Sequence, residues 1–199
     1  MPKISIPTHL IVLFISLLGI LGVSGTRVKT ENMHDPIPRV LSMFTQVPDG
    51  FVKVVDTVDG DTIKVLIDGQ EKTVRLLGVD TPETKDPRKK VQCFGHAASD
   101  FTKKTLEGKA VHLIMDSTQG DTDKYHRLLR YVYLEDGTML NELLVREGYA
   151  FAYERFPTMR LENLKELEKI AREQKKGLWG GCEVSIKNGG QTKSTQTVE

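Results

Sequence analysis

The sequence predicts an α+β fold, in which five strands close into a small β-barrel and about three α-helices flank it. Two observations support this prediction. Residues 51–134 contain several short segments in which apolar and polar residues alternate, and this alternation is typical of half-buried strands. Three longer segments repeat their apolar residues with the period of a helix, so that each presents one apolar face.

The first three strands are expected at residues 51–56, 62–67 and 73–79, where they would form a twisted meander. In the third, alternation places Arg75 on the same face as Leu77 and Val79, with Val74 and Leu76 opposite. An arginine on a partly apolar face needs an anionic partner. Two more strands are predicted at residues 111–115 and 129–134.

The first helix is predicted at residues 92–106, ended by Gly108. A short helix is expected at 139–147, and a third at 161–175, where Glu168 and Arg172 have the spacing of an i,i+4 ion pair. The apolar faces consist of Phe94, Ala98, Phe101 and Thr105, then Leu140, Leu143 and Leu144, then Leu164, Leu167 and Ala171. Five strands with helices in this order are typical of an OB-fold barrel.

The chain of 199 residues has room for one domain with appendages, and we place the domain at residues 50–182. Residues 10–23 are nearly all apolar, and they lead into small residues that suit a signal peptidase. We therefore expect residues 1–25 to be an export signal, because the apolar run is shorter than the ~20 residues that span a bilayer. The alternative is a membrane anchor that holds the protein on the outer side of the membrane. Residues 26–49 are expected to be a linker. The polar residues 183–199 are expected to be a disordered tail.

The two cysteines, Cys93 and Cys182, are far apart in the sequence. A disulfide between them would tie the end of the domain to the flank of the barrel and add about 4 to 5 kcal/mol in the chain-entropy model. The alternative is two unpaired thiols, which a reducing compartment would favour.

Chemistry-bearing residues are concentrated in one predicted hairpin, which contains Asp59-Gly60-Asp61-Thr62, then Arg75, then Asp80-Thr81-Pro82-Glu83. Carboxylates at strand ends can hold a hard cation, and an arginine fork can bind a phosphate. Asp59-Gly60 alone indicates only a turn, and the second motif fits a helix start. No amphipathic helix follows directly, however, so metal-assisted attack on a phosphodiester is the better interpretation.

A second charged cluster, Asp121 to Arg127, precedes the last predicted strand. Alone it would be interpreted as a charged loop. Beside the first cluster, a second arginine could complete a clamp on a transition state whose charge spreads over phosphoryl oxygens.

The run DGDTIKVLIDGQEKTVRLLGVDTPE, together with DKYHRLL, resembles the thermonuclease family typified by staphylococcal nuclease, and the resemblance extends over about residues 52–179. It implies a calcium-dependent endonuclease that cleaves DNA and RNA, prefers single strands and leaves 3′-phosphate products. Separately from the resemblance, we expect the protein to be a monomer. The resemblance also implies roles for nine residues. Asp61 and Asp80 would bind Ca²⁺ through their carboxylates, and Thr81 would bind it through its backbone carbonyl. Glu83 would orient or deprotonate the attacking water, and Arg75 and Arg127 would bind the scissile phosphate. Lys124 and Tyr125 would contact a terminal phosphate, and Tyr153 would pack against a base.

Three residues depart from the family pattern. His126 stands where the family usually has a glycine, and at positive φ it would be strained by about one to three kcal/mol and could misaim Arg127. Arg130 replaces a small residue and is interpreted as a simple exposed strand residue. Arg155 replaces a base-contacting tyrosine, so base preference is open.

Two other functions fit the same residues. A non-catalytic OB-fold module could bind nucleic acid or protein, and a surface protein could use calcium only for stability. The formal net charge of +1 indicates that nucleic-acid binding depends on local basic groups rather than on bulk charge.

Overall fold

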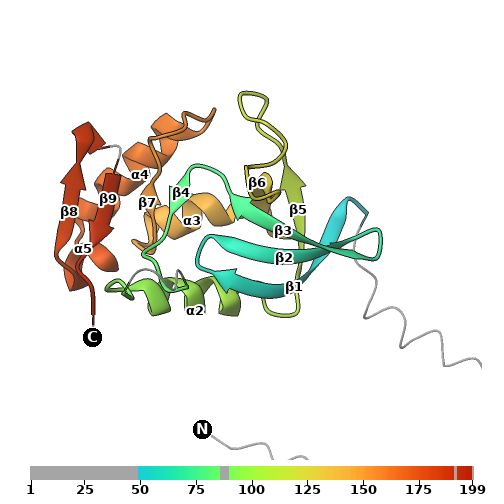
Figure 1. The fold of residues 1–199 in the computed structure, drawn as a ribbon, viewed down its shortest axis with the longest axis horizontal. Helices are drawn as coiled ribbons and strands as arrows, with labels where there is room; N and C mark the ends of the chain where they lie inside the picture. The colour runs from blue at the N-terminus through green and yellow to red at the C-terminus, as the bar shows by residue number, and fades with distance from the viewer. Residues whose placement is uncertain (1–48, 86–89, 191, 199) are drawn as a thin grey trace, which may run out of the picture.

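The computed structural model describes residues 49–85, 90–190 and 192–198 (Figure 1). The predicted export signal lies outside the described residues, as does nearly all of the predicted linker. Within the described ranges, no helix has the length and apolar character needed to cross a membrane.

Five strands close into a barrel in the order β1-β2-β3-β6-β5. Their bounds are β1 Phe51–Asp59, β2 Thr62–Ile67, β3 Gln70–Leu76, β5 Ala110–Ile114 and β6 Leu128–Tyr133. The β3–β6 pair is parallel and the other pairs are antiparallel. Alternate apolar residues of these strands are buried in one continuous core, which includes Ile63, Val65, Val74, Leu76, Val111 and Val132. The prediction of a five-stranded OB-fold barrel is confirmed.

The third predicted strand is interrupted, which corrects the expectation of one strand at 73–79. β3 ends at Leu76, Gly78 turns the chain with φ 72°, and β4 (Val79–Asp80) pairs with β7 (Phe151–Ala152) outside the barrel. A Cβ atom on Gly78 would lie 2.6 Å from Leu164 Cδ1, so both the backbone angle and the packing require glycine here. The turn places Asp80 beside the rim of the barrel.

Three helices flank the barrel, as predicted: α2 (Gly95–Leu106), α3 (Leu140–Arg146) and α4 (Leu161–Glu173). A fourth, α5 (Leu178–Gly181), is a single turn. α2 begins later than predicted because Phe94 has a left-handed backbone, with φ 69°. Phe94 therefore precedes the helix, and its ring packs against Tyr149 at 5.4 Å between centroids.

The predicted pair of Glu168 with Arg172 does not form. Glu168 is buried on the inner side of α4, where it accepts hydrogen bonds from Lys193 Nζ (2.8 Å) and from the Ala152 N–H (2.9 Å). Arg172 lies over the Trp179 ring instead, 6.0 Å from its centroid. Glu168 thus pairs with a residue far along the chain, which helix periodicity could not indicate.

The expected disordered tail is also wrong for its described part, which forms a hairpin of β8 (Val184–Lys187) and β9 (Thr192–Thr195) with the 3₁₀ turn η1 (Asn188–Gly190). The hairpin stands beside α4 and α5 at one end of the molecule (Figure 1). The disulfide between Cys93 and Cys182 is formed, with 6.0 Å between the Cα atoms, just before the hairpin begins. The polar hairpin is tied to the rest of the protein by this disulfide and by the ion pairs of Lys193 with Glu154 and Glu168.

Candidate active site

Asp61 lies in the tight turn between β1 and β2 and is buried. Its Oδ1 accepts a hydrogen bond from Thr62 Oγ1 (2.9 Å), and its Oδ2 accepts one from the Thr81 N–H (3.1 Å). The preceding Gly60 makes this contact feasible, since a Cβ atom there would lie 2.8 Å from Thr81 Cγ2. The carboxylate therefore joins the first hairpin to the end of β4.

Arg75 projects from β3 between two carboxylates. Its Nη2 lies 3.0 Å from Asp61 Oδ2 and 3.3 Å from Asp80 Oδ1. Its Nη1 donates to the carbonyls of Leu76 (2.6 Å) and Val79 (2.8 Å), which are exposed by the break between β3 and β4. The anionic partner expected for Arg75 is thus this pair of aspartates.

The same geometry tests whether Asp61 and Asp80 suit a hard cation. Both carboxylates converge on one cationic nitrogen, and carboxylate oxygens are the donors that Ca²⁺ prefers. The buried Thr81 Oγ1 beside them has no hydrogen-bond partner. Over the described ranges, no three His, Cys, Asp or Glu side chains converge as a metal-binding group. The donors fit Ca²⁺ if water and substrate complete its shell, as they do at open catalytic sites.

Asp59 belongs to this region, although the sequence indicated only a turn there. Its Oδ1 accepts hydrogen bonds from the Gly60 N–H (2.8 Å) and from Thr84 Oγ1 (2.7 Å). Burial raises the pKa of Asp59, repulsion from Asp61 and Glu83 adds to this, and the two hydrogen bonds oppose it. Asp59 links the first hairpin to the loop that carries Glu83.

Glu83 lies in the loop after β4. Its Oε1 accepts hydrogen bonds from the backbone N–H groups of Thr84 (3.0 Å) and Lys85 (2.8 Å), which turn the carboxylate back over its own loop. Its backbone N–H donates to Gln92 Oε1 at 2.8 Å. Sequence patterns gave no indication of Gln92, because a contact between a side chain and a distant backbone group has no periodic signal.

Arg127 is held by Asp123 through a bidentate ion pair, with Nε and Nη2 at 2.7 and 2.6 Å from Asp123 Oδ2. Burial would raise the pKa of Asp123, but hydrogen bonds from the side chain and backbone of Arg127 and from the Tyr125 N–H lower it overall. Arg127 Nη1 also lies 3.5 Å from Thr62 Oγ1, which itself donates to Asp61. Arg127 is therefore connected to the Asp61 and Arg75 cluster through one threonine.

His126 has φ 61°, so the condition under which a histidine at this position would be strained is met. Its N–H donates to the Asp123 carbonyl (2.9 Å) and closes a tight turn, while the Arg127 carbonyl accepts the Asp123 N–H (3.0 Å). The turn directs Arg127 toward Thr62, so the histidine strains the backbone without removing the arginine from the cluster.

Arg130 corrects another expectation, since its side chain is only 11% exposed. Its Nη2 pairs with Asp121 Oδ1 at 2.5 Å, and its Nη1 donates to the Asp121 carbonyl. Arg130 thus fixes the loop before β6 and is not a simple exposed strand residue.

A groove of about 680 Å³ runs past these residues. Arg155 and Phe156 line it together with five of the predicted site residues, which are Arg75, Lys124, Tyr125, Arg127 and Tyr153. The other four predicted site residues, Asp61, Asp80, Thr81 and Glu83, do not line the groove. Arg75 connects the groove to the carboxylates of Asp61 and Asp80. The Tyr125 and Phe156 side chains are more than half exposed.

The two loops that form the groove walls are tied together by buried Asp116. It accepts hydrogen bonds from Tyr131 Oη (2.5 Å), the Met159 N–H (2.8 Å) and Thr118 Oγ1 (2.6 Å). Burial alone would raise the pKa of Asp116, but these bonds outweigh burial and lower it to about 2. Burial and the bond to Asp116 raise the pKa of Tyr131 to about 12.

Comparison with known proteins gives consistent similarities. Residues 73–181 match a family model described as staphylococcal nuclease homologue. The chain is 42% identical over 128 residues to a thermonuclease of Staphylococcus hyicus, covering 64% of this chain and 74% of that protein. It is 35% identical over 154 residues to an uncharacterized endonuclease of Escherichia coli O157:H7, covering 76% and 93%. A prophage-derived endonuclease of Bacillus subtilis, YokF, is 44% identical over 125 residues, covering 61% and 41%.

Proposed function

Because this chain belongs to the family of staphylococcal nuclease homologues and is a nuclease that hydrolyses phosphodiester bonds, we propose that it is a calcium-dependent endonuclease acting on DNA and RNA. The observation that carries the proposal is the cluster of Asp61, Arg75 and Asp80 at the rim of the barrel, with Arg127 one threonine away. Two carboxylates for a hard cation and two guanidinium forks for a phosphate then lie beside one groove.

Asp61 and Asp80 would hold the Ca²⁺ ion, with Thr81 beside them. When bound, the ion supplies Lewis-acid stabilisation of the charge on the phosphoryl oxygens. Arg75 and Arg127 exchange carboxylate partners for phosphate oxygens when substrate binds, because both forks suit either anion. The ion pairs of the free protein keep both guanidinium groups close to this geometry.

Glu83 is the group that we assign to the attacking water. Its carboxylate accepts a proton as the water oxygen bonds to phosphorus. The bond from phosphorus to the 5′ oxygen then breaks, the 5′ oxygen takes a proton from solvent, and the phosphate stays on the 3′ side. Arg127 donates hydrogen bonds to the oxygens on which charge develops.

The groove favours single strands. The exposed Tyr125 and Phe156 rings, with Tyr153 beside them, offer faces on which unpaired bases can stack. Lys124 adds local positive charge for a terminal phosphate, which a chain of near-zero net charge needs.

We further propose that the protein acts as a monomer outside the cytoplasm. The apolar segment at residues 10–23 supports export, with retention as a membrane anchor as the alternative. The Cys93–Cys182 disulfide supports it independently, since such bonds persist in oxidising compartments.

One observation favours a second candidate function. Both arginines are already paired with carboxylates, and His126 holds a strained backbone beside Arg127. If those pairs do not open, the barrel would bind single-stranded nucleic acid without cutting it.

The test is the release of acid-soluble nucleotides from heat-denatured DNA, with Ca²⁺ or with chelator, by the full chain and by its Glu83→Gln and Asp61→Ala variants. We expect calcium-dependent release that both substitutions abolish. Tight binding of the same DNA without cleavage in any divalent metal would instead support the non-catalytic module.

A further inference from the structure

The C-terminal segment, defined as residues 192–198, lies against residues 91–93, a short stretch just before α2. Cys93 donates its N–H to the Gln196 carbonyl (2.7 Å) and accepts a bond from Thr195 Oγ1 (2.7 Å). Gln92 and Thr197 form a β-bridge, and the Val198 N–H donates to the Val91 carbonyl (2.8 Å). A polar segment without a core of its own is thus paired, over residues 195–198, with the stretch 91–93 that leads into α2.

The residue at the centre of this pairing, Gln92, also holds the backbone of Glu83 on both sides. Its Oε1 accepts the Glu83 N–H (2.8 Å), and its own N–H donates to the Glu83 carbonyl (2.9 Å). The side-chain amide therefore replaces the partner that a neighbouring strand would provide. Glu83 lies on a loop and not in a strand, and these two bonds tie its backbone to the residue three positions before α2.

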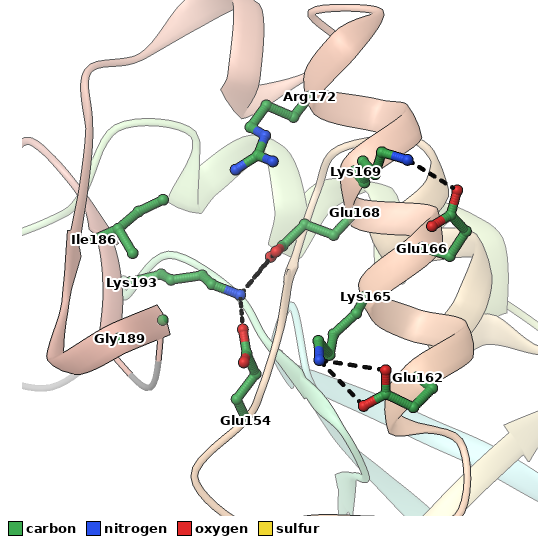
Figure 2. Close-up of a pocket in the computed structure, with 11 residues that line it drawn as sticks. Glu154, Glu162, Lys165, Glu166, Glu168, Lys169, Arg172, Ile186, Gly189 and Lys193 are labelled. Atoms are coloured by element: carbon green, nitrogen blue, oxygen red, sulfur yellow. Dashed lines mark hydrogen bonds and ion pairs between the residues drawn. The ribbon is translucent and has the colours of Figure 1, made fainter.

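The hairpin that continues into this segment is anchored deep in the protein by Lys193. This side chain is only 5% exposed, and its Nζ contacts Glu154 Oε1 (2.6 Å), Glu168 Oε2 (2.8 Å) and the Ala152 carbonyl (3.1 Å). Figure 2 shows Lys193 reaching from the hairpin to two carboxylates, those of Glu168 on α4 and of Glu154 on the segment that follows β7. The cost of burying the ammonium group is offset only while both partners stay in place, which fixes the hairpin.

Two further connections complete the arrangement. The disulfide joins Cys93 to Cys182, which lies two residues before β8 begins. Ala152, which accepts a hydrogen bond from Lys193, lies on β7, and β7 pairs with β4, the strand that carries Asp80. The hairpin thus contacts the elements of the active site at two places, through Gln92 at Glu83 and through Ala152 at β4.

We propose that Gln92 is a positioning residue for Glu83, and that the C-terminal segment holds Gln92 in place for this role. The inference rests on the proposed role of Glu83 in catalysis. Misplacing a catalytic group by about 1 Å can cost on the order of 100-fold in rate without weakening substrate binding. Loss of the Gln92 acceptor therefore lowers kcat and leaves KM almost unchanged.

The test compares three substitutions in the full chain. Gln92→Met keeps the length of the side chain and removes its acceptor, whereas Gln92→Glu keeps an acceptor oxygen. Gln70→Met makes the same chemical change at an exposed position of β3, far from the site. For cleavage of a single-stranded oligodeoxynucleotide in Ca²⁺, we expect Gln92→Met to lower kcat by about 10- to 100-fold with KM within about twofold. Gln92→Glu should recover most of that loss, and Gln70→Met should match the unsubstituted protein.

A second measurement does not depend on catalysis. Hydrogen exchange of the Glu83 amide, followed by NMR in metal-free protein, should accelerate at least about tenfold in Gln92→Met, while barrel amides keep their protection. Thr195→Val, which removes the hydroxyl bonded to Cys93, should accelerate the same amide to a smaller extent. Unchanged kcat and unchanged Glu83 exchange in Gln92→Met would overturn the proposal. If the unsubstituted protein does not cleave at all, the proposed function fails, and the exchange experiment still decides whether Gln92 holds Glu83.

Discussion

The active site has a half built on strands and a half built on loops, and the two halves hold their charged groups by different means. Asp61 and Arg75 lie next to or on barrel strands and Asp80 lies on β4, where neighbouring carbonyls and sheet register fix the backbone. Glu83 and Arg127 lie on loops, where a side chain from another position supports each, Gln92 at the Glu83 backbone and Asp123 at the Arg127 side chain. Groups on strands thus share their support with the fold, and groups on loops depend on dedicated partners.

The largest expected effects come from two separate substitutions, one that removes Arg75 from the strand half and one that removes Arg127 from the loop half. Arg75→Ala and Arg127→Ala should each lower kcat by about 1,000-fold or more, since a single arginine at a phosphoryl transition state has effects of this size. Only Arg75→Ala should also lower the free energy of unfolding substantially, by about 2 to 4 kcal/mol, because it leaves the buried Asp61 without its cation. Arg127 pairs on a more open loop, so its loss should cost below about 1 kcal/mol.

Single-turnover cleavage and urea unfolding of both variants measure these effects. Arg75→Lys and Arg127→Lys are the matched controls, since each keeps the charge and loses the fork. Equal losses of stability in the two alanine variants would show that the halves are not supported differently.

An intermediate effect is expected at Asp116, which ties the two loops of the groove. Its pKa of about 2 lies below the ordinary value, so its ionised form stabilises the folded state above about pH 4. This contribution is lost as the pH falls from about 4 to 2. Asp116→Asn should therefore lower the free energy of unfolding at pH 7 by about 1 to 3 kcal/mol, and the difference from the unsubstituted protein should shrink toward pH 2.

Urea unfolding across this pH range makes the comparison, with Asp100→Asn on the exposed face of α2 as the control. The alkaline side has the opposite sign. Since the pKa of Tyr131 is raised to about 12, folded-state stability should fall as the pH rises from about 10 to 12, and Tyr131→Phe should remove that part of the decline. A difference between Asp116→Asn and the unsubstituted protein that stays constant with pH would contradict the assignment.

The smallest effect is expected from relaxing the loop half at His126. His126→Gly removes a side chain from a backbone at φ 61°, and we expect a gain of about 0.5 to 1 kcal/mol in stability, reduced by the greater freedom of glycine in the unfolded chain. His126→Ala keeps the Cβ atom and should gain nothing. Thermal unfolding compares the two, and kcat should rise by no more than a few fold because Arg127 is already directed toward Thr62. A gain of the same size in both variants would show that the imidazole ring, not the backbone angle, causes the strain.

The sequence predicted the strand half far better than the loop half. Alternation located the barrel strands and predicted that Arg75 needs an anionic partner, because side-chain direction on a strand repeats every two residues. It could not predict the break at Gly78, since Leu77 and Val79 continue the alternation, and the side chain that leaves no room for a Cβ atom there, Leu164, is distant in the sequence. The catalytic roles came from family resemblance, while Gln92 and Asp116 act through contacts between loops that leave no periodic pattern.

The C-terminal hairpin shows the same limit in another form. Its polar composition predicted disorder because composition measures the apolar area available for burial. Its order depends instead on Lys193 meeting Glu154 and Glu168 and on a cysteine almost ninety residues away, and neither is visible until the chain has folded. Glu168 was assigned to Arg172 for the same reason, since helix spacing considers only neighbours along the helix.

The parallel pairing of β3 with β6 has a consequence for how the protein folds. It places Val74 beside Leu128 and Arg75 beside Leu129, although the chain between them must first form α2 and β5. Pairings between distant segments form slowly, because loop-closure entropy is lost before the contacts stabilise the chain. Arg75 and Arg127 become neighbours only when this seam of the barrel closes. A refolding chain should therefore regain its helical circular dichroism signal first and its power to cut nucleic acid only at the end.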